Sequence, residues 1–137
     1  MADFGAGMMW LKPLLSPANP HLAIDFIRRD AETLVLDLNR DSLAEIRADI
    51  GFLSGVLEYI ADVPTFARNL TALPLRQIIL SYCTLEKHGD LQARRNLNWA
   101  SHESIFTLLP PFLKRYHLSA LDDVNGNTIL VFERKEE

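Results

Sequence analysis

Cysteine is almost absent from this sequence: Cys83 is the only one among 137 residues. A single cysteine cannot form an intramolecular disulfide, and it excludes a zinc site built from several thiolates. Long apolar runs are also missing, since residues 78–80 and 129–132 fall far short of the roughly 20 residues that a membrane-spanning helix needs. The N-terminus lacks the basic start and apolar stretch of a secretory signal. We therefore predict a soluble protein, with no membrane partner and, by default, a cytoplasmic location.

Positive charge is in short supply. The chain has 14 Lys and Arg residues against 18 Asp and Glu residues, which gives a formal net charge of −4. Affinity for a phosphate backbone comes mainly from clustered Lys and Arg, so we expect no nucleic-acid partner. Two basic pairs, Arg28 with Arg29 and Arg94 with Arg95, are interpreted as solvated loop charges rather than as an anion site.

The first two thirds of the chain alternate between two kinds of segment. Apolar runs without polar alternation, typical of parallel strands buried on both faces, occupy residues 21–26, 33–38, 50–53 and 77–82, with a fragment at residues 2–4. Between them lie candidate helices over residues 8–15 and 56–73, the second broken near Pro64, and a short turn at residues 41–46. This alternation predicts a single α/β domain over residues 1–137, with a doubly wound, mostly parallel sheet and helices on both faces.

The last third predicts a different ending. Residues 84–99 form a polar stretch that is too long for a routine connection, so we expect it to be functional or mobile. A helix should begin near Ser101, without a reciprocal Glu cap, and Pro110 and Pro111 should kink or end it. Asn125 and Gly126 then stand between two strand-like runs, which predicts an antiparallel hairpin at the end of the sheet.

The junction between the first strand and the following helix holds an acidic glycine loop, which runs from Asp3 through Gly5 and Ala6 to Gly7. Gly5 permits a tight turn, and Gly7 lets a ligand approach the backbone without an intervening side chain. Asp3 adds a negative charge beside this opening. Taken alone, two spaced glycines are equally consistent with a purely conformational turn.

Two further acids strengthen the case for a ligand. Asp25 stands at the end of the second strand, 20 residues after Gly5, where a carboxylate can accept hydrogen bonds from both hydroxyls of a ribose. Asp37 ends the third strand. Because the carboxyl ends of neighbouring parallel strands share one crevice, we expect Asp3, Asp25 and Asp37 to converge there.

In this order the motifs resemble the class I, Rossmann-like family of S-adenosylmethionine-dependent methyltransferases. The segment from Asp3 to Gly7 is similar to the family's acidic glycine loop, Asp25 to its ribose-binding acid, and Asp37 with Leu38 and Asn39 to its adenine-side segment. Residues 52–59, with Ser54 and Gly55, resemble the fourth-strand motif. The similarity runs through essentially the whole chain, with Met9 standing at the third glycine-like position of the loop.

The resemblance implies a sheet of order 3-2-1-4-5-7-6 with strand 7 antiparallel. It also implies binding of S-adenosylmethionine and methyl transfer to an unidentified acceptor, for which a small molecule is one candidate. The implied cofactor-binding residues are Asp3, Gly5, Ala6, Gly7, Asp25, Phe26, Asp37, Leu38, Asn39, Ser54 and Gly55. Only Met1 and Ala2 precede Asp3, so we expect the usual N-terminal cap to be absent, or to be supplied by an oligomer or a partner chain.

Methyl transfer mainly requires alignment and exclusion of water, so a dedicated catalytic side chain is optional. If the acceptor must lose a proton, Tyr59 and His102 are the candidate bases, against the simpler interpretations of a packed ring and a surface histidine. We expect no bound metal.

Two other classes of protein stay open. The first is a non-catalytic module that keeps the fold for binding or scaffolding. The second is a nicotinamide-dependent oxidoreductase, because an acid 20 residues after the first glycine also suits a dinucleotide fold. Trp10 counts against the oxidoreductase, since it stands where the dinucleotide fingerprint has a glycine for close helix packing.

Overall fold

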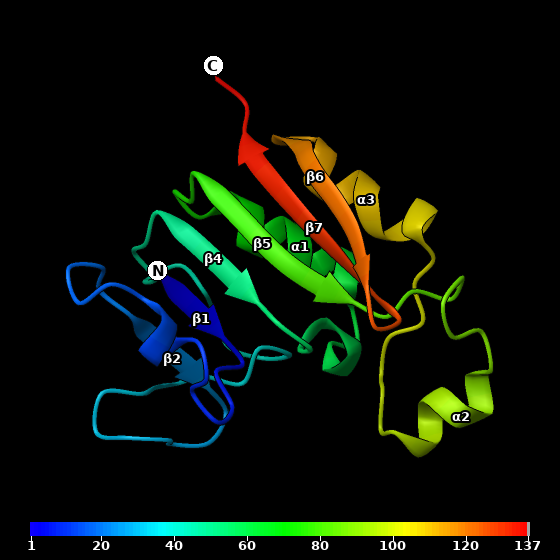
Figure 1. Ribbon diagram of the computed structural model, residues 1–137, viewed down its shortest axis with the longest axis horizontal. Helices are drawn as coiled ribbons and strands as arrows, with labels where there is room; N and C mark the ends of the chain where they lie inside the picture. The colour runs from blue at the N-terminus through cyan, green and yellow to red at the C-terminus, as the bar shows by residue number, and fades with distance from the viewer. Residues whose placement is uncertain (137) are drawn as a thin grey trace.

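The apolar runs form a seven-stranded sheet in the computed structural model, which describes residues 1–136 (Figure 1). The strands are β1 Ala2–Phe4, β2 Leu22–Asp25, β3 Leu34–Val35, β4 Ile50–Leu53, β5 Gln77–Tyr82, β6 Tyr116–Val124 and β7 Asn127–Arg134. Their order is β3-β2-β1-β4-β5-β7-β6, and β7 pairs antiparallel with both β5 and β6 while the other pairs are parallel. The sheet order and the closing hairpin expected from the sequence are confirmed.

The helices differ more from expectation. They are the 3-10 turns η1 Lys12–Leu14 and η2 Leu57–Tyr59 and the α-helices α1 Val63–Ala72, α2 Leu91–Asn96 and α3 Ile105–Leu113. The prediction of a helix over residues 8–15 is wrong, because only the three-residue turn η1 forms there. The left-handed backbone of Gly7, at φ 52°, and Met9, at φ 61°, prevents a regular helix from starting after β1. The turn predicted at residues 41–46 stays non-helical.

Local capping explains where the longer helices begin. Asp62 caps α1 by accepting the Thr65 N–H, with Pro64 in the first turn. The helix α3 begins four residues later than Ser101, because Ser104 and Thr107 form the reciprocal capping box there. It continues through Pro110 and Pro111 and ends at Leu113. The polar stretch over residues 84–99 contains the short helix α2.

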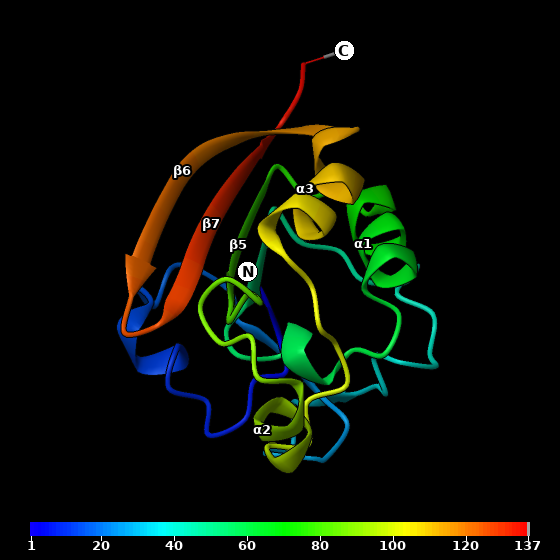
Figure 2. The same ribbon diagram turned by 90° about the vertical axis from the view of Figure 1, so that its right-hand side faces the viewer.

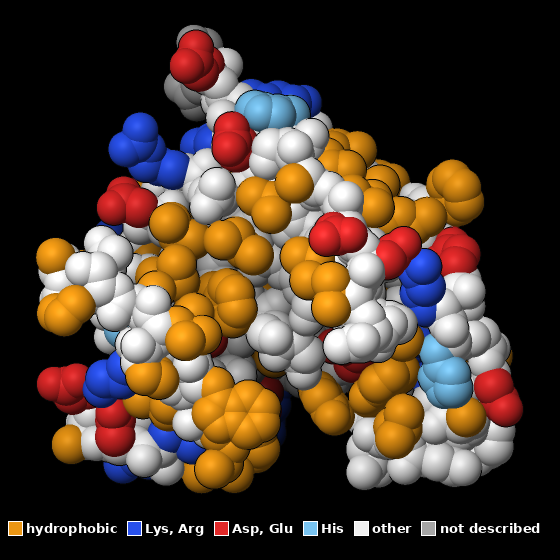
Figure 3. Space-filling view, in the orientation of Figure 1, with side chains coloured by type: hydrophobic (Ala, Val, Ile, Leu, Met, Phe, Trp, Pro, Cys, Tyr) orange, Lys and Arg blue, Asp and Glu red, His pale blue; other side chains and the backbone are white. Residues whose placement is uncertain are grey.

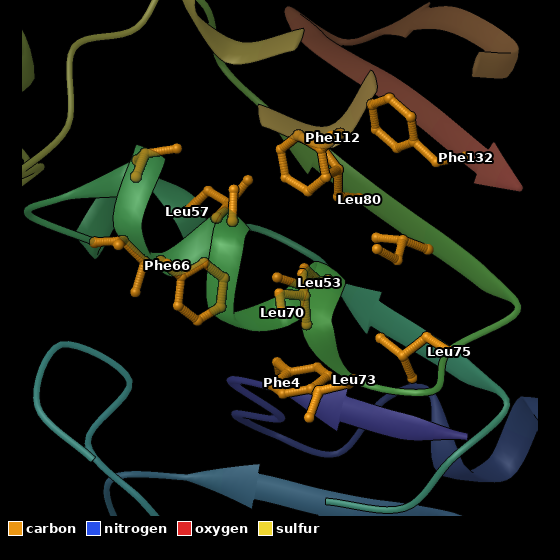
Figure 4. Packing of buried hydrophobic residues seen from close by; sticks show 14 of the residues in the cluster. Phe4, Leu53, Leu57, Phe66, Leu70, Leu73, Leu75, Leu80, Phe112 and Phe132 are labelled. Atoms are coloured by element: carbon orange, nitrogen blue, oxygen red, sulfur yellow. The ribbon is translucent and has the colours of Figure 1, made fainter. Parts of the chain in front are cut away.

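The hydrophobic core lies between the sheet and one helical layer. Helices α1 and α3 pack against each other on one side of the sheet, and η1 lies on the other (Figure 2). Leucine and phenylalanine side chains from the strands and helices meet in this layer (Figure 4). Phe112 of α3 stacks on Phe132 of β7 with ring centroids 4.8 Å apart. This packing anchors the closing hairpin to the helical layer.

The register brings several loops to one edge. Phe4 pairs with both Ile24 and Leu53, so β1, β2 and β4 end side by side. Asp25, the last residue of β2, pairs with Val35 of β3. The connections that follow these four strands therefore start from the same edge of the sheet, which is where ligands bind in open α/β sheets.

No helix among residues 1–136 has both the length and the apolar character needed to cross a membrane.

Replacing Phe112 with Ala should test the core. Its side chain is fully buried, so we expect a loss of about 3 to 5 kcal/mol in the free energy of unfolding, measured by chemical denaturation. Phe106→Ala is the matched control on the same helix, because Phe106 is 80% exposed and its removal should change stability by about 0.5 kcal/mol or less. Equal losses in the two variants would contradict the proposed packing.

Candidate functional site

The glycine loop after β1 is held by backbone contacts. The N–H groups of Gly5 and Ala6 both donate to the carbonyl of Ile24, at 2.8 and 3.0 Å. Gly5 has φ 70°, and a Cβ added to it would lie 2.5 Å from the Val56 Cγ2 atom. Glycine is therefore required here both for the left-handed backbone and for the close approach of the segment after β4.

Asp25 fixes the far end of the loop. Its Oδ2 atom accepts the Gly7 N–H at 2.8 Å, and its Oδ1 atom accepts the Ile27 N–H at 3.1 Å. Arg29 also contacts the carboxylate, with Nε 3.2 Å from Oδ2 and Nη2 3.4 Å from Oδ1. Burial by itself would raise the pKa of Asp25, but the hydrogen bonds from Gly7, Ile27 and Arg29 outweigh it and hold the pKa below its ordinary value. The group therefore stays ionised at neutral pH.

A first cavity of about 530 Å³ opens beside this carboxylate. Of the residues expected to bind the cofactor, those that line it are Gly5, Gly7, Asp25, Phe26, Asp37, Leu38, Asn39 and Gly55. Arg29, Leu36, Val56 and Ile60 also line it and were missed from the sequence. Among the three apolar residues, Leu36 lies in an apolar run, and Val56 and Ile60 lie in the segment predicted as a helix, so their part in a wall could be expected only after the strand ends were located.

A second cavity of about 410 Å³ lies along the same glycine loop. Gly5, Gly7 and Gly55 line both cavities, and Asp3, Ala6 and Ser54 line only the second. The remaining residues of its wall are Met8, Trp10, Leu11, Leu14 and Phe52. Trp10 is 78% exposed rather than part of the core, and Met8 and Leu14 are exposed as well. Figure 3 shows hydrophobic side chains gathered on the face of the sheet that Figure 1 turns to the viewer.

Asp3 is separated from the other two acids. It lines the second cavity, whereas Asp25 and Asp37 line the first. Its Oδ2 atom lies 3.0 Å from Nε2 of His21, and both side chains are largely buried. Burial raises the pKa of the Asp3 carboxyl, although the contact with His21 acts in the opposite direction. The three acids thus surround one glycine loop but do not share one cavity.

The loop after β3 is tied to η2 through Asn39. The Asn39 side chain donates from Nδ2 to the Tyr59 carbonyl at 3.0 Å and accepts the Ala61 N–H on Oδ1 at 2.8 Å. Asp37 in turn accepts the Asn39 N–H at 3.0 Å. The amide of Asn39 therefore fixes the cavity wall, and its polar atoms are already engaged with the backbone.

The two candidate bases lie in different places. Tyr59 is partly exposed and lines the first cavity. His102 accepts the Arg94 Nε–H on Nδ1 at 3.1 Å, which leaves the proton of a neutral imidazole on Nε2. His102 lines neither of the two cavities.

Arg94 is not a solvated loop charge, because its side chain is completely buried. It donates to the carbonyls of Cys83 and Ser101, at 2.8 and 3.1 Å, and to the Tyr82 hydroxyl at 3.1 Å. No pattern in the sequence indicates this burial, since the partners are mostly backbone carbonyls of a non-regular segment. Arg94 thereby fixes the segment after β5 against the end of that strand.

Glu58 is the acidic member of this buried cluster. Its Oε1 atom accepts the Cys83 N–H at 2.9 Å, while Oε2 is buried without a hydrogen-bond partner. Burial raises the pKa of the Glu58 carboxyl above its ordinary value, against the opposing effects of the Cys83 hydrogen bond and the Arg94 charge.

Within residues 1–136, no group of three or more His, Cys, Asp or Glu side chains is arranged to hold a metal ion.

Comparisons with known proteins identify the fold. No protein-family model matches the sequence, and no curated protein matches it. A chain in the complex of the Haloferax volcanii Trm112 methyltransferase activator with a methyltransferase has a TM-score of 0.76 and 12% identity, and the match covers 98% of this chain and 82% of that one. An S-adenosylmethionine-dependent methyltransferase from Mesorhizobium loti has a TM-score of 0.75 and 13% identity, with 97% and 89% covered.

A third structure holds ligands. It is an O-methyltransferase from neocarzinostatin biosynthesis in complex with S-adenosylmethionine and 2-hydroxy-5-methyl naphthoic acid, with a TM-score of 0.68 and 14% identity. The match covers 98% of this chain and 48% of that one. Together with the strand order, these likenesses show that the chain has the class I methyltransferase fold. The fold implied by the sequence resemblance is confirmed.

Replacing Gly5 with Ala should damage the loop through two separate effects. Left-handed backbone costs a non-glycine residue about 1 to 2 kcal/mol, and the clash with Val56 should add about 1 to 3 kcal/mol. Gly126→Ala isolates the first effect, because Gly126 has φ 78° but open space around its Cβ position. Urea denaturation should therefore show a larger loss for Gly5→Ala. A loss no greater than that of Gly126→Ala would show that Val56 does not constrain the loop.

Glu58 predicts a pH dependence of stability. Its pKa is higher in the folded than in the unfolded chain, so its contribution is complete at low pH and is lost as the pH rises through the folded pKa. Glu58→Gln keeps the acceptor for the Cys83 N–H and cannot ionise. The stability of this variant relative to wild type should therefore increase between pH 5 and pH 8. Glu45→Gln, at an exposed position, should follow the wild-type profile, and parallel profiles for all three proteins would refute the assignment.

Proposed function

We propose that this protein binds S-adenosylmethionine and transfers its methyl group to an acceptor whose identity is open, a small molecule being one candidate. The observation that supports this most strongly is the buried Asp25 carboxylate at the end of β2, which lines a cavity of about 530 Å³ beside the glycine loop. In a doubly wound sheet, an acid at this position accepts hydrogen bonds from ribose hydroxyls. The strand order and the similar solved structures favour a methyltransferase over the nicotinamide-dependent oxidoreductase.

The adenosine part of the cofactor fits the first cavity. Asp25 would accept hydrogen bonds from the ribose, and Leu36, Leu38 and Ile60 supply apolar surface for the adenine ring. Asp37 would face the adenine side. The residues present therefore agree with the chemistry of a nucleoside, which needs an acceptor for its hydroxyls and an apolar slot for its base.

The amino-acid part fits the second cavity. Asp3 lines this cavity, and a carboxylate is the natural partner of an ammonium group. Gly5, Gly7 and Gly55 line both cavities. One extended ligand would therefore occupy both cavities at once and cross between them over glycines, where no side chain is in the way. Ser54 and Ala6 would contact the amino-acid part on this path.

Bound S-adenosylmethionine would supply an electrophilic methyl group on a sulfonium. The task of this chain is then to align an acceptor and exclude water, which can lower a barrier by about 7 to 11 kcal/mol in ideal models. Tyr59 stays the candidate base, since its ring is partly exposed, whereas His102 lines neither cavity and its Nδ1 atom accepts from Arg94. A non-catalytic binding module stays the alternative, since nothing in the two cavities requires turnover.

A partner chain stays a prediction. The exposed side chains of Met8, Trp10 and Leu14 stand beside the second cavity, and the Haloferax volcanii structure is a complex with an activator. Such a partner would cover the side of the cofactor that is open here. A cytoplasmic location, expected from the sequence, is part of the same proposal.

Binding of S-adenosylhomocysteine should test the proposal directly. At about 100 times its dissociation constant, the ligand should add roughly 2.7 kcal/mol to the stability of the wild-type protein. Asp25→Asn should weaken binding about tenfold or more, because it removes a charged acceptor of hydrogen bonds. Asp122→Asn is the control, since β6 is at the opposite edge of the sheet from β3. Calorimetric titration that detects no binding to wild type would refute the proposal.

Turnover needs a separate readout. Wild-type protein should transfer radiolabel from S-adenosylmethionine to a component of a cell extract, and Asp25→Asn should do so much more slowly. Binding without any transfer would instead support the non-catalytic module.

A further inference from the structure

Arg29 occupies the side of Asp25 that a ligand would need. It is the fourth residue after Asp25 and contacts both oxygens of the carboxylate, at 3.2 Å from Nε to Oδ2 and 3.4 Å from Nη2 to Oδ1. The Arg29 side chain is 29% exposed and lines the first cavity. Two neighbouring N–H groups of one guanidinium thus face the two oxygens of one carboxylate, which is a fork geometry.

The hydrogen-bonding capacity of Asp25 is full in this arrangement. A carboxylate offers about four lone-pair positions. Oδ1 accepts from the Ile27 N–H and from Arg29, and Oδ2 accepts from the Gly7 N–H and faces Arg29 Nε. The Gly7 and Ile27 donors belong to the backbone of the loops that build the cavity. Arg29 is therefore the partner that can leave without dismantling the site.

A ribose diol and the Arg29 guanidinium require the same acceptor positions. Each presents two adjacent donors to the two oxygens of one carboxylate. We infer that Arg29 is a built-in competitor for the ribose-binding carboxylate, displaced when a ribonucleoside diol binds to Asp25, and that it thereby sets the affinity of the site. This inference rests on the proposed function, because it assumes that the first cavity receives a ribose.

The competition should be modest in size. A partly exposed ion pair is worth a factor of about two to ten in an equilibrium constant, because water and salt screen it. A ligand can therefore displace Arg29, yet its affinity is reduced by that factor. Added salt weakens the pair further, so an uncharged ribonucleoside should bind more tightly as ionic strength rises. Most electrostatic contributions to binding become weaker as ionic strength rises, so this salt dependence would be the reverse of the usual one.

The experiment compares Arg29→Met with Arg28→Met. Both variants lose one positive charge, but Arg28 donates to the carbonyls of Asp30 and Ala31 and makes no described contact with Asp25. Calorimetric titration with S-adenosylhomocysteine should give a dissociation constant about three- to tenfold lower for Arg29→Met than for wild type. Arg28→Met should stay within about twofold of wild type. Adenosine and 2′-deoxyadenosine complete the comparison, because the preference for adenosine should be larger in Arg29→Met.

If Arg29→Met does not fold, the inference can be tested on the wild-type protein alone. The dissociation constant for adenosine, which is uncharged, should decrease between 0.05 and 0.5 M NaCl, by about two- to threefold. An unchanged or increased constant would overturn the inference.

The outcomes separate the two proposals. Wild-type binding that depends on Asp25, together with equal or weaker binding by Arg29→Met, would overturn the competitor role and leave the proposed function standing. Weaker binding would show instead that Arg29 holds Asp25 in place for the ligand. No binding of S-adenosylhomocysteine to wild type or either variant would overturn both.

Discussion

The hydrogen bond from the Gly7 N–H to Asp25 is the contact on which the rest of the site depends. It joins the loop after β1 to the end of β2, and the Ile24 carbonyl supports it by accepting from Gly5 and Ala6. The loop needs this fixation because no regular helix follows it to hold its far end. The Asp25 carboxylate thus holds the far end of the loop, which helix packing would do in a longer crossover. Both cavities take their shape from this loop, because its glycines line both of them.

The two acids beside the loop have opposite electrostatic environments. Asp25 is buried but receives backbone and guanidinium donors, and its pKa is lowered. Asp3 is buried with His21 as its partner, and its pKa is raised. Asp25 is therefore a fixed, ionised acceptor that a hydroxyl can use once Arg29 leaves, whereas burial opposes the charge of Asp3 in spite of its contact with His21, so a further cationic partner would favour that charge. This difference matches a ligand that is a nucleoside at one end and carries an ammonium at the other.

Sequence reasoning worked where local chemistry decides the outcome. Apolar runs, the pre-proline break and the Asn125-Gly126 turn have direct physical causes, and the α/β alternation and the closing hairpin follow from them. The order of the strands came instead from the resemblance to the methyltransferase family. It failed where tertiary context decides. The helix expected over residues 8–15 was overridden by left-handed residues in the loop, and Arg94 is buried because backbone carbonyls surround it. The alternation of strands and helices was enough to predict that the acids at the strand ends lie near the glycine loop. The side of the loop that each carboxylate occupies depends on its side-chain partner, which is His21 for Asp3 and Arg29 for Asp25.

The central claim is that one ligand lies across the glycine loop, with its ribose on Asp25 and its amino-acid end beside Asp3. A crystal structure of the protein with S-adenosylhomocysteine tests it most directly. The account predicts both ribose hydroxyls within hydrogen-bonding distance of the Asp25 carboxylate, the adenine between Leu36, Leu38 and Ile60, and the ammonium group in the cavity lined by Asp3. Electron density for the ligand on another face of the sheet, or a ribose that does not contact Asp25, would contradict it.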